Sequence, residues 1–216
     1  GAVVLPNGTG KTVRTLVFCK EDKAQAALDA VTPSVVSTYS ELVDAIIKGG
    51  NIEFANDITV DKWIMFSETL NISDGSIITI DKIDVNIDGK GHTLTVKDFE
   101  RTGNGGRLFY NASNLNIANL NIKYPEGATF GGLYFQSGVI KDVNFISGGV
   151  AIGPGSGNIK VENCTFATND TAIYFEKECD NLTVTGCTFN QPDSKNVILL
   201  RGTEKFTNNI VNSGRT

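Results

Sequence analysis

Histidine and cysteine are few in this chain of 216 residues, which has one histidine and four cysteines. The cysteines Cys19, Cys164, Cys179 and Cys187 lack the paired spacing of a zinc site. His92 lies in a turn before a strand, where a structural or solvent-facing side chain is the ordinary case. We therefore expect neither a metal site nor a resident cofactor.

Long apolar runs and an excess of basic residues are also missing. No run approaches the roughly 18 apolar residues of a membrane-spanning helix, so we expect no membrane span. Lys and Arg number 19 against 24 Asp and Glu, which gives a net charge of −5 and a pI of about 4.9. This balance argues against nucleic-acid binding. Charged residues make up only 20%, so we expect a polar but weakly charged surface.

What the chain does contain is a short phrase that recurs about every 22 residues in its second half. The phrase reads apolar, polar, Asn-like, apolar, polar, aromatic. Such copies indicate one structural unit that is used repeatedly, each copy covering the open face of its neighbour. The copies are IANLNI (117–122), IKDVNF (140–145), VENCTF (161–166), VTGCTF (184–189) and the degenerate FTNNIV (206–211).

The third position of the phrase predicts a bend. It holds residues that tolerate a left-handed backbone, so each copy is expected to consist of two short strands separated by a corner. These residues are Asn119, Asp142, Asn163, Gly186 and Asn208.

The fourth and sixth positions lie two residues apart, so in a strand they point the same way. We expect them to face inward and to stack between coils at about 4.8 Å as a continuous apolar column. The fourth positions are Leu120, Val143, Cys164 and Cys187. The two cysteines would then lie at the same inward site of adjacent coils, either as buried thiols or as a disulfide between coils.

A second strand recurs between the phrases, at 133–135, 150–152, 172–175 and 197–200. Alternating strands with bends and no helix between copies predict an all-β, single-stranded parallel β-helix. A doubly wound sheet would need a helical crossover in every interval. One helix fits this scheme, at about 39–48, where Thr38 and Glu41 have capping-box spacing and Gly49 suits the C-terminal cap. We expect this helix to cover the open end of a solenoid domain that spans 34–216.

Residues 1–33 do not belong to the repeat. Strands near 3–5 and 13–19 and a helix at about 21–30 are expected, which would make a small α+β appendage. We expect this segment to dock the solenoid onto a larger assembly. An open C-terminal end of the solenoid is a second expected surface for a partner or for another copy of the chain.

Two resemblances follow from these motifs. The stretches TYSELVDAIIKGGNIEFANDITV and VNIDGKGHTLTV, with the repeated phrase, resemble the pectin-lyase-like right-handed parallel β-helix superfamily over about 37–211. That resemblance implies a right-handed coil and an internal ladder at the third position, formed by Asn119, Asn163 and Asn208. The stretch VLPNGTGKTVR and the residues after it, over 2–28, resemble the interdomain segment of ribosomal protein L1.

Members of the β-helix superfamily include polysaccharide lyases and hydrolases, bacterial surface adhesins and phage appendages. Its enzymes use paired carboxylates, or Ca²⁺ with a basic residue. The matching candidates here are Asp170, Glu176 and Glu178 with Arg201 as the base, and Ca²⁺ would be expected only in that case. The alternative interpretation is that these are solvated charges at a strand end and turn.

Exposed aromatic rings are candidates for stacking on sugars, above all Tyr134 and Tyr174. The signatures of the known enzymes are missing, so we expect a non-catalytic structural or binding module. It would be extracellular, on a cell or virion surface, adhesin-like or part of a phage appendage, with a glycan as the expected ligand. The alternative is a carbohydrate-active enzyme, a polysaccharide lyase or glycoside hydrolase, that acts on an acidic polysaccharide.

Overall fold

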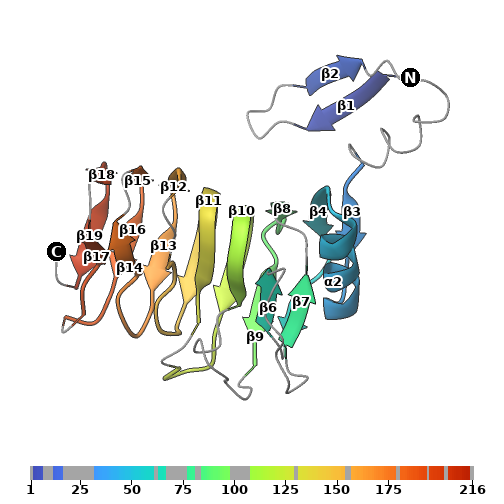
Figure 1. Ribbon diagram of the computed structural model, residues 1–216. Helices are drawn as coiled ribbons and strands as arrows, with labels where there is room; N and C mark the ends of the chain where they lie inside the picture. The colour runs from blue at the N-terminus through green and yellow to red at the C-terminus, as the bar shows by residue number, and fades with distance from the viewer. Residues whose placement is uncertain are drawn as a thin grey trace.

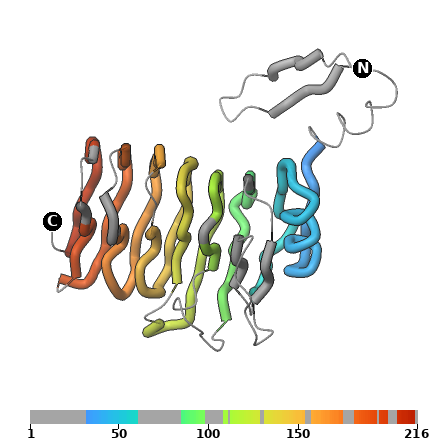
Figure 2. Tube along the Cα trace, viewed as in Figure 1, coloured from blue at the N-terminus to red at the C-terminus, as the bar shows by residue number. Residues whose placement is uncertain are grey.

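Short strands lie side by side in a stack, and the chain passes along the stack turn by turn (Figure 1, Figure 2). Neighbouring strands within the described part of the stack are parallel. This arrangement confirms the predicted all-β parallel architecture. The computed structural model describes residues 2–6, 12–16, 32–60, 63–66, 77–80, 84–97, 108–128, 131–153, 157–178, 181–193, 195–201 and 204–214.

The elements of the stack begin with one strand and one helix, and strands follow to the C-terminal end. In chain order they are β3 (Ser34–Val36), α2 (Tyr39–Lys48), β4 (Asn51–Phe54), β5 (Ile58–Val60), β6 (Trp63–Phe66), β7 (Ile77–Ile80), β8 (Asp84–Asp88), β9 (Thr93–Val96), β10 (Phe109–Lys123), β11 (Leu133–Ile146), β12 (Ile159–Glu162), β13 (Thr165–Ala167), β14 (Ile173–Glu178), β15 (Leu182–Thr185), β16 (Thr188–Asn190), β17 (Ile198–Arg201), β18 (Glu204–Thr207) and β19 (Ile210–Ser213).

The stack has three faces. The long strand β10 shows this, since different parts of it pair with a strand of each face. Its residues 109–110 pair with β6, residues 114–118 with β8 and residues 121–123 with β9. The first face comprises β3, β4, β8, β10, β11, β12, β15 and β18, the second β5, β9, β10, β11, β13, β16 and β19, and the third β7, β6, β10, β11, β14 and β17.

The predicted corners are all present. Every residue at the third position of the phrase has a left-handed backbone, with φ of 52° at Asn119, 53° at Asp142 and Asn163, 67° at Gly186 and 56° at Asn208. Each of these residues separates a strand of the first face from a strand of the second. Residue types that tolerate positive φ therefore recur because the corner requires that conformation.

The internal ladder that the resemblance implied at these positions is wrong. Asn119, Asn163 and Asn208 are all exposed to solvent. A left-handed corner residue sits on the outside of the bend, and the next residue is the one that turns inward. Contacts between corners do occur, but on the surface: Asn119 Nδ2 donates to Asp88 Oδ1 at 3.1 Å.

The apolar column inside the stack is confirmed. Leu120, Val143, Cys164 and Cys187 are each at most 2% exposed. At the sixth position, Phe145 and Phe166 stack with centroids 5.0 Å apart and planes 6° apart, and Phe166 and Phe189 stack at 4.8 Å and 4°. These separations match the rung spacing of about 4.8 Å, so identical rings pack directly over one another.

Cys164 and Cys187 are free thiols, which decides between the two alternatives for this pair. Cys187 Sγ accepts a hydrogen bond from the Cys164 amide at 3.4 Å, and Cys164 Sγ donates to the Ile140 carbonyl at 3.5 Å. The hydrogen bond with Cys187, together with burial, raises the pKa of Cys164. Both side chains act as small buried apolar residues.

The helix expected over about 39–48 is α2, and it lies at the β3–β4 end of the stack (Figure 1). Its capping box is complete, since Thr38 Oγ1 accepts from the Glu41 amide and Glu41 Oε2 accepts from the Thr38 amide. Its buried residues Leu42, Ala45 and Ile46 join the core of the stack. No helix in the described part of the chain is long and apolar enough to cross a membrane.

Before the stack, β1 (Ala2–Pro6) and β2 (Thr12–Leu16) form an antiparallel pair in which Val4 lies opposite Arg14. Strands were predicted near 3–5 and 13–19, and residues 17–20 lie outside the described residues. The helix predicted at about 21–30 lies outside them as well.

The aromatic stack generates a first prediction. Phe166→Ala removes the middle ring and leaves a cavity between Phe145 and Phe189, so we expect a loss of about 3–5 kcal/mol in the free energy of unfolding. Urea unfolding followed by circular dichroism measures the change. The control is Thr165→Ala, whose side chain points outward beside it, with an expected change within about 0.5 kcal/mol. Equal losses in both variants would contradict the stack as the source of stability.

The corners generate a second prediction. At Asn163 the backbone is left-handed, a conformation that is sterically strained for alanine but not for glycine. We expect Asn163→Ala to cost about 1 kcal/mol and Asn163→Gly to stay within about 0.5 kcal/mol of the parent. The same urea titration compares the two variants. An alanine variant as stable as the glycine variant would show that the corner does not demand positive φ.

Candidate functional site

The third face presents tyrosine side chains to solvent. Buried and partly exposed residues alternate along its strands: Leu133 and Phe135 are buried and Tyr134 between them is partly exposed. The same alternation places Tyr110 outward next to buried Phe109, and Tyr174 outward next to buried Ile173. Because successive side chains of a strand point to opposite sides, these tyrosines lie on the outer surface.

Strand pairing aligns these residues into one column. The Tyr110 and Tyr134 rings stack, with centroids 5.1 Å apart and planes 22° apart. Parallel bridges join Leu133 to Ile152 and Ile152 to Ile173, so the residues that follow each of them share one outward position. We call this row the tyrosine column; its members are Tyr110, Tyr134, Gly153, Tyr174 and Leu199.

Gly153 carries no side chain between two of the tyrosines, and the Tyr134 ring lies close to it. A methyl group at that position would contact the Tyr134 ring at 3.5 Å and the Tyr174 carbonyl at 3.8 Å. The rungs of Tyr134 and Tyr174 are thus separated by one rung without a side chain, a span of roughly 10 Å. Leu199, 44% exposed, extends the apolar surface beyond Tyr174. The two candidate tyrosines therefore lie on one surface, with the rung of Gly153 between them.

Asp170 has a structural environment. Its Oδ1 accepts from the Thr171 amide at 2.8 Å and lies 3.3 Å from Lys195 Nζ. Its carbonyl accepts from Thr168 Oγ1 at 3.2 Å and from Gln191 Nε2. The Asp170 carboxylate thus accepts a hydrogen bond within a turn and forms an ion pair with Lys195. The Asp170 carbonyl is held by the side chains of Thr168 and Gln191, a buried contact that we call the Asp170 clasp.

That clasp is formed by two buried polar side chains from successive coils. Thr168 is 3% exposed and Gln191 is 1% exposed. Gln191 Nε2 donates to Thr168 Oγ1 at 2.6 Å, and Gln191 Oε1 accepts from the Thr168 amide at 3.1 Å. Buried polar atoms that are satisfied in this way hold a loop in one conformation.

The other acidic candidates belong to the third face. Glu176 and Glu178 are in β14 and Arg201 is in β17, where Glu178 and Arg201 are register partners. Their side chains lie outside the described residues. No group of three or more His, Cys, Asp or Glu side chains within the described ranges is placed to hold a metal ion.

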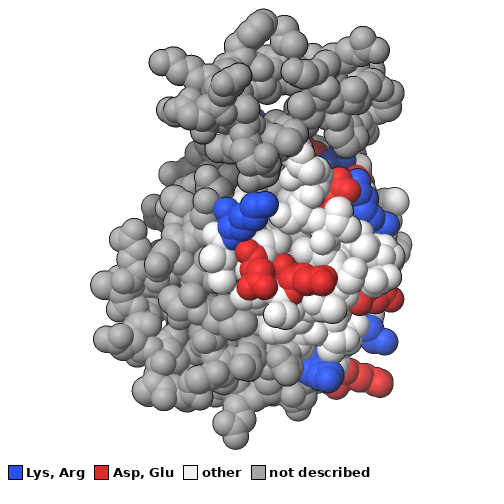
Figure 3. Space-filling view, turned by 90° about the vertical axis from the view of Figure 1, so that its right-hand side faces the viewer, with Lys and Arg blue, Asp and Glu red and all other residues white. Residues whose placement is uncertain are grey.

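Charge is spread thinly over the end of the molecule that carries α2. Acidic and basic side chains lie there in small separate groups among uncharged residues, over the part of the surface that is described (Figure 3). This distribution agrees with the weakly charged surface expected from composition.

Comparison with known proteins identifies the family. A family model described as "Right handed beta helix region" matches residues 65–215. The chain belongs to the right-handed β-helix family. The match covers the tyrosine column and the Asp170 clasp. It also identifies the coil of the stack as right-handed. No solved structure matches the chain significantly.

A second likeness concerns a ribosomal protein. Large ribosomal subunit protein uL1 of Chlamydia caviae is 52% identical over 54 residues, which are 25% of this chain and 22% of that protein. The uL1 of Nitrosomonas eutropha is 73% identical over 30 residues, 14% of this chain and 13% of that protein. The β-helix chain thus spans about a fifth or less of the length of these relatives. The short likeness agrees with the resemblance seen at 2–28.

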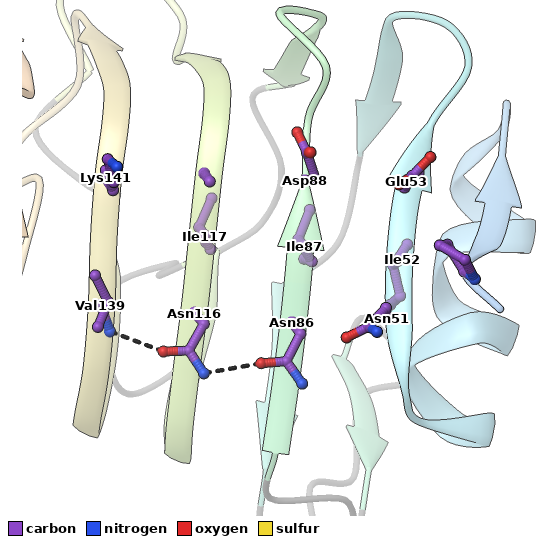
Figure 4. A pocket seen from close by; sticks show the side chains of 12 residues that line it. Asn51, Ile52, Glu53, Asn86, Ile87, Asp88, Asn116, Ile117, Val139 and Lys141 are labelled. Carbon is purple, nitrogen blue, oxygen red and sulfur yellow. Dashed lines mark hydrogen bonds between the residues drawn. The ribbon is translucent and has the colours of Figure 1, made fainter. Parts of the chain in front are cut away.

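Sequence reasoning missed a groove of about 360 Å³ on the first face. We call it the amide groove; one side is lined by Asn51, Asn86 and Asn116 and the other by Glu53, Asp88 and Lys141 (Figure 4). The available signal was an Asn-Ile pair at 51–52, 86–87 and 116–117. These pairs are spaced by 35 and 30 residues rather than by about 22, so the repeat of the second half did not reveal them.

The carboxylates of the amide groove are held by Lys90. Its Nζ lies 3.0 Å from Glu53 Oε1 and 3.1 Å from Asp88 Oδ2. Burial opposes ionisation of Asp88, but hydrogen bonds from the Lys90 amide and from Asn119 outweigh it, so the pKa of Asp88 is lowered. The hydrogen bond to Glu53 raises the pKa of Lys90. Lys90 thus bridges the two carboxylates and fixes their positions.

The buried clasp generates a third prediction. Gln191→Ala leaves the buried Thr168 amide without a partner and removes one of the two contacts of the Thr168 hydroxyl, so we expect a loss of about 1–3 kcal/mol in the free energy of unfolding. The control is Asn190→Ala, at the exposed neighbouring position, with an expected change within about 0.5 kcal/mol. Thermal and urea unfolding of both variants provide the measurement. If the Gln191 variant is as stable as the control, the clasp does not stabilise the Asp170 loop.

Proposed function

We propose that this β-helix chain is a non-catalytic module that binds a glycan along the tyrosine column. One observation carries the proposal: Tyr110, Tyr134 and Tyr174 share a single outward column along the stack, with Gly153, which has no side chain, between two of them. Aromatic rings stack on the apolar faces of sugar rings, and their hydroxyl groups reach sugar hydroxyls. Because Tyr110 and Tyr134 stack on each other, the proposed stacking ring for a sugar is Tyr174, and the other two tyrosines extend the surface along the stack.

The surroundings of the column favour binding over catalysis. A weakly charged surface suits a ligand held by stacking and hydrogen bonds, and Leu199 continues the apolar strip. The one acidic candidate with a described side chain, Asp170, is engaged by Lys195 and by the Thr171 amide. These two contacts of Oδ1 favour a structural role for this carboxylate over proton transfer.

Several finer points belong to the same proposal. We assign the chain to the pectin-lyase-like branch of β-helix proteins and to a cell or virion surface, as an adhesin-like or phage-appendage module. Helix α2 acts as the cap of the solenoid, which its buried side chains in the core support. Residues 1–33 form a separate appendage. We also propose a contact surface for a partner or a second copy at Phe206, which is 39% exposed, and Ile210, which is 59% exposed.

A glycan array tests this function. We expect the labelled chain to bind a subset of glycans and Tyr174→Ala to weaken that binding about tenfold, because one stacking ring is worth roughly 1–2 kcal/mol. The matched control is Tyr174→Phe, which keeps the ring and should retain affinity within about threefold. The array measures affinity by titration of the labelled protein.

Three outcomes count against the proposal. If the chain binds no glycan on the array, the proposal is wrong. If Tyr174→Ala binds with the affinity of the parent, the glycan site does not lie on the tyrosine column. New reducing ends or unsaturated products from pectate or alginate would establish the enzymatic alternative instead.

A further inference from the structure

Two free thiols inside the stack, those of Cys164 and Cys187, have no part in the proposed function. They occupy the same inward position in adjacent coils, because the residues on either side of them are register partners through β12 with β15 and β13 with β16. Residues aligned in this way have Cα atoms about 4.8 Å apart. Disulfides join residues whose Cα atoms are about 4.4–6.8 Å apart, so the pair meets this condition without a change of register.

The two sulfur atoms are also direct neighbours. Cys187 Sγ accepts from the Cys164 amide at 3.4 Å, and the two thiol groups are hydrogen-bonded to each other. Each sulfur points toward the coil before its own: Cys164 Sγ donates to the Ile140 carbonyl at 3.5 Å, and Cys187 Sγ to the Val161 carbonyl at 3.7 Å. The side chains thus leave their strands in the same direction, and Cys187 Sγ reaches the rung of Cys164.

The environment makes the two thiols unequal. The hydrogen bond from the Cys164 thiol is the largest influence on Cys187, and it lowers the pKa of that thiol in spite of burial. The same bond, together with burial, raises the pKa of Cys164. The thiolate is the form of cysteine that reacts with oxidants. Cys187 is therefore the sulfur that is oxidised first, and Cys164 is the thiol that can react with the product.

Only a small oxidant can reach this pair, because both thiols are at most 1% exposed. The last described coil covers Cys187, and Asn209 fastens it: its Oδ1 accepts from the Cys187 amide at 2.8 Å and its Nδ2 donates to the Val184 carbonyl at 3.0 Å. In this coil Phe206 is 39% exposed and Ile210 59%. A segment with so little cover opens locally more easily than the rest of the stack. Its opening would admit a molecule as small as hydrogen peroxide to Cys187.

We propose that Cys164 and Cys187 are a redox-sensitive pair that closes into a crosslink between adjacent coils when the protein meets hydrogen peroxide. The Cys187 thiolate attacks one peroxide oxygen, the O–O bond breaks, and the hydroxide that leaves takes up the proton lost by the thiol. The resulting sulfenic acid is attacked at sulfur by Cys164; the S–S bond forms, the S–O bond breaks, and the hydroxyl leaves with the Cys164 proton as water. Two thiols are oxidised, and one peroxide is reduced to two water molecules.

The crosslink would stabilise the stack without changing its outer surface. It closes a loop of one complete coil, and such a loop restricts the unfolded chain more than the folded one. The coil it fastens runs from Cys164 to Cys187 and carries Tyr174 on its outer side. The inference does not depend on the proposed function, because the crosslink and its effect on stability are measured without a ligand.

Mass spectrometry of the full chain tests the crosslink, in a Cys19→Ser, Cys179→Ser background that removes other pairings. We expect peroxide to lower the mass by two hydrogen atoms and to join tryptic peptides 161–177 and 178–195. Dithiothreitol should reverse both changes. Urea unfolding of the oxidised form should have a midpoint about 1 M above that of the reduced form.

Single variants in the same background test the order of the two steps. In Cys164→Ser the sulfenic acid has no thiol to react with, so dimedone, a reagent for sulfenic acids, should label Cys187. In Cys187→Ser we expect no label on Cys164. Equal labelling of the two variants would contradict the assigned order.

The route of access is tested by the rate of crosslinking. Asn209→Ala removes both hydrogen bonds that fasten the last described coil, so the crosslink should form about tenfold faster. The control is Asn212→Ala, whose amide bonds to Asn190 on the outer surface of the same coil. It should react at the parent rate, and equal rates in all three proteins would show that peroxide does not enter by this route.

Three further results would overturn the proposal. A chain that retains both thiols in excess peroxide has no redox-sensitive pair. Oxidation of Cys187 beyond the sulfenic acid without a crosslink would show that Cys164 cannot reach it. Joined peptides that occur only in a dimer on a non-reducing gel would place the bond between two copies of the chain.

Discussion

Register between coils is the constraint on which this structure depends. Parallel pairing sets each residue directly over its equivalent in the next coil, at about 4.8 Å. An inward side chain must therefore pack on a copy of itself. Phe145, Phe166 and Phe189 meet this condition because flat rings stack at 5.0 and 4.8 Å with nearly parallel planes. A slip of one residue would turn the whole column outward, which is why every corner needs a left-handed residue at the same place.

Outward side chains follow the same register as the inward ones. Equivalent outward positions therefore line up along the stack, and the candidate sites are rows of side chains. On the third face, register places Tyr110, Tyr134 and Tyr174 in line although their intervals in the chain differ. On the first face it places Asn86 beside Asn116 and allows their amides to bond at 2.8 Å. Because the core fixes the position of each rung, these outward groups are preorganised without needing contacts of their own.

The sequence predicted what repeats at short range. The corners, the buried fourth and sixth positions and the helix at 39–48 each follow from a local pattern, and the structure confirms them. The second strand predicted at 133–135, 150–152, 172–175 and 197–200 is confirmed on the third face, where bridges join Leu133 to Ile152 and Ile152 to Ile173 and β14 pairs with β17. The internal asparagine ladder was wrong, since tolerance of positive φ does not tell which way a corner side chain points.

Departures from regularity coincide with both candidate sites, and register explains why. In a perfect repeat each outward position would carry a similar side chain, and neighbouring side chains would fill the space between rungs. Gly153 interrupts the tyrosine column, and Ala118 interrupts the wall between Asp88 and Lys141. The corner at 89–92 is also longer than the one at 119–120, which brings Lys90 to both carboxylates. A regular core can tolerate such local changes because they alter only the outward side of a rung, so binding surfaces arise where the outward repeat is broken and the inward repeat is kept.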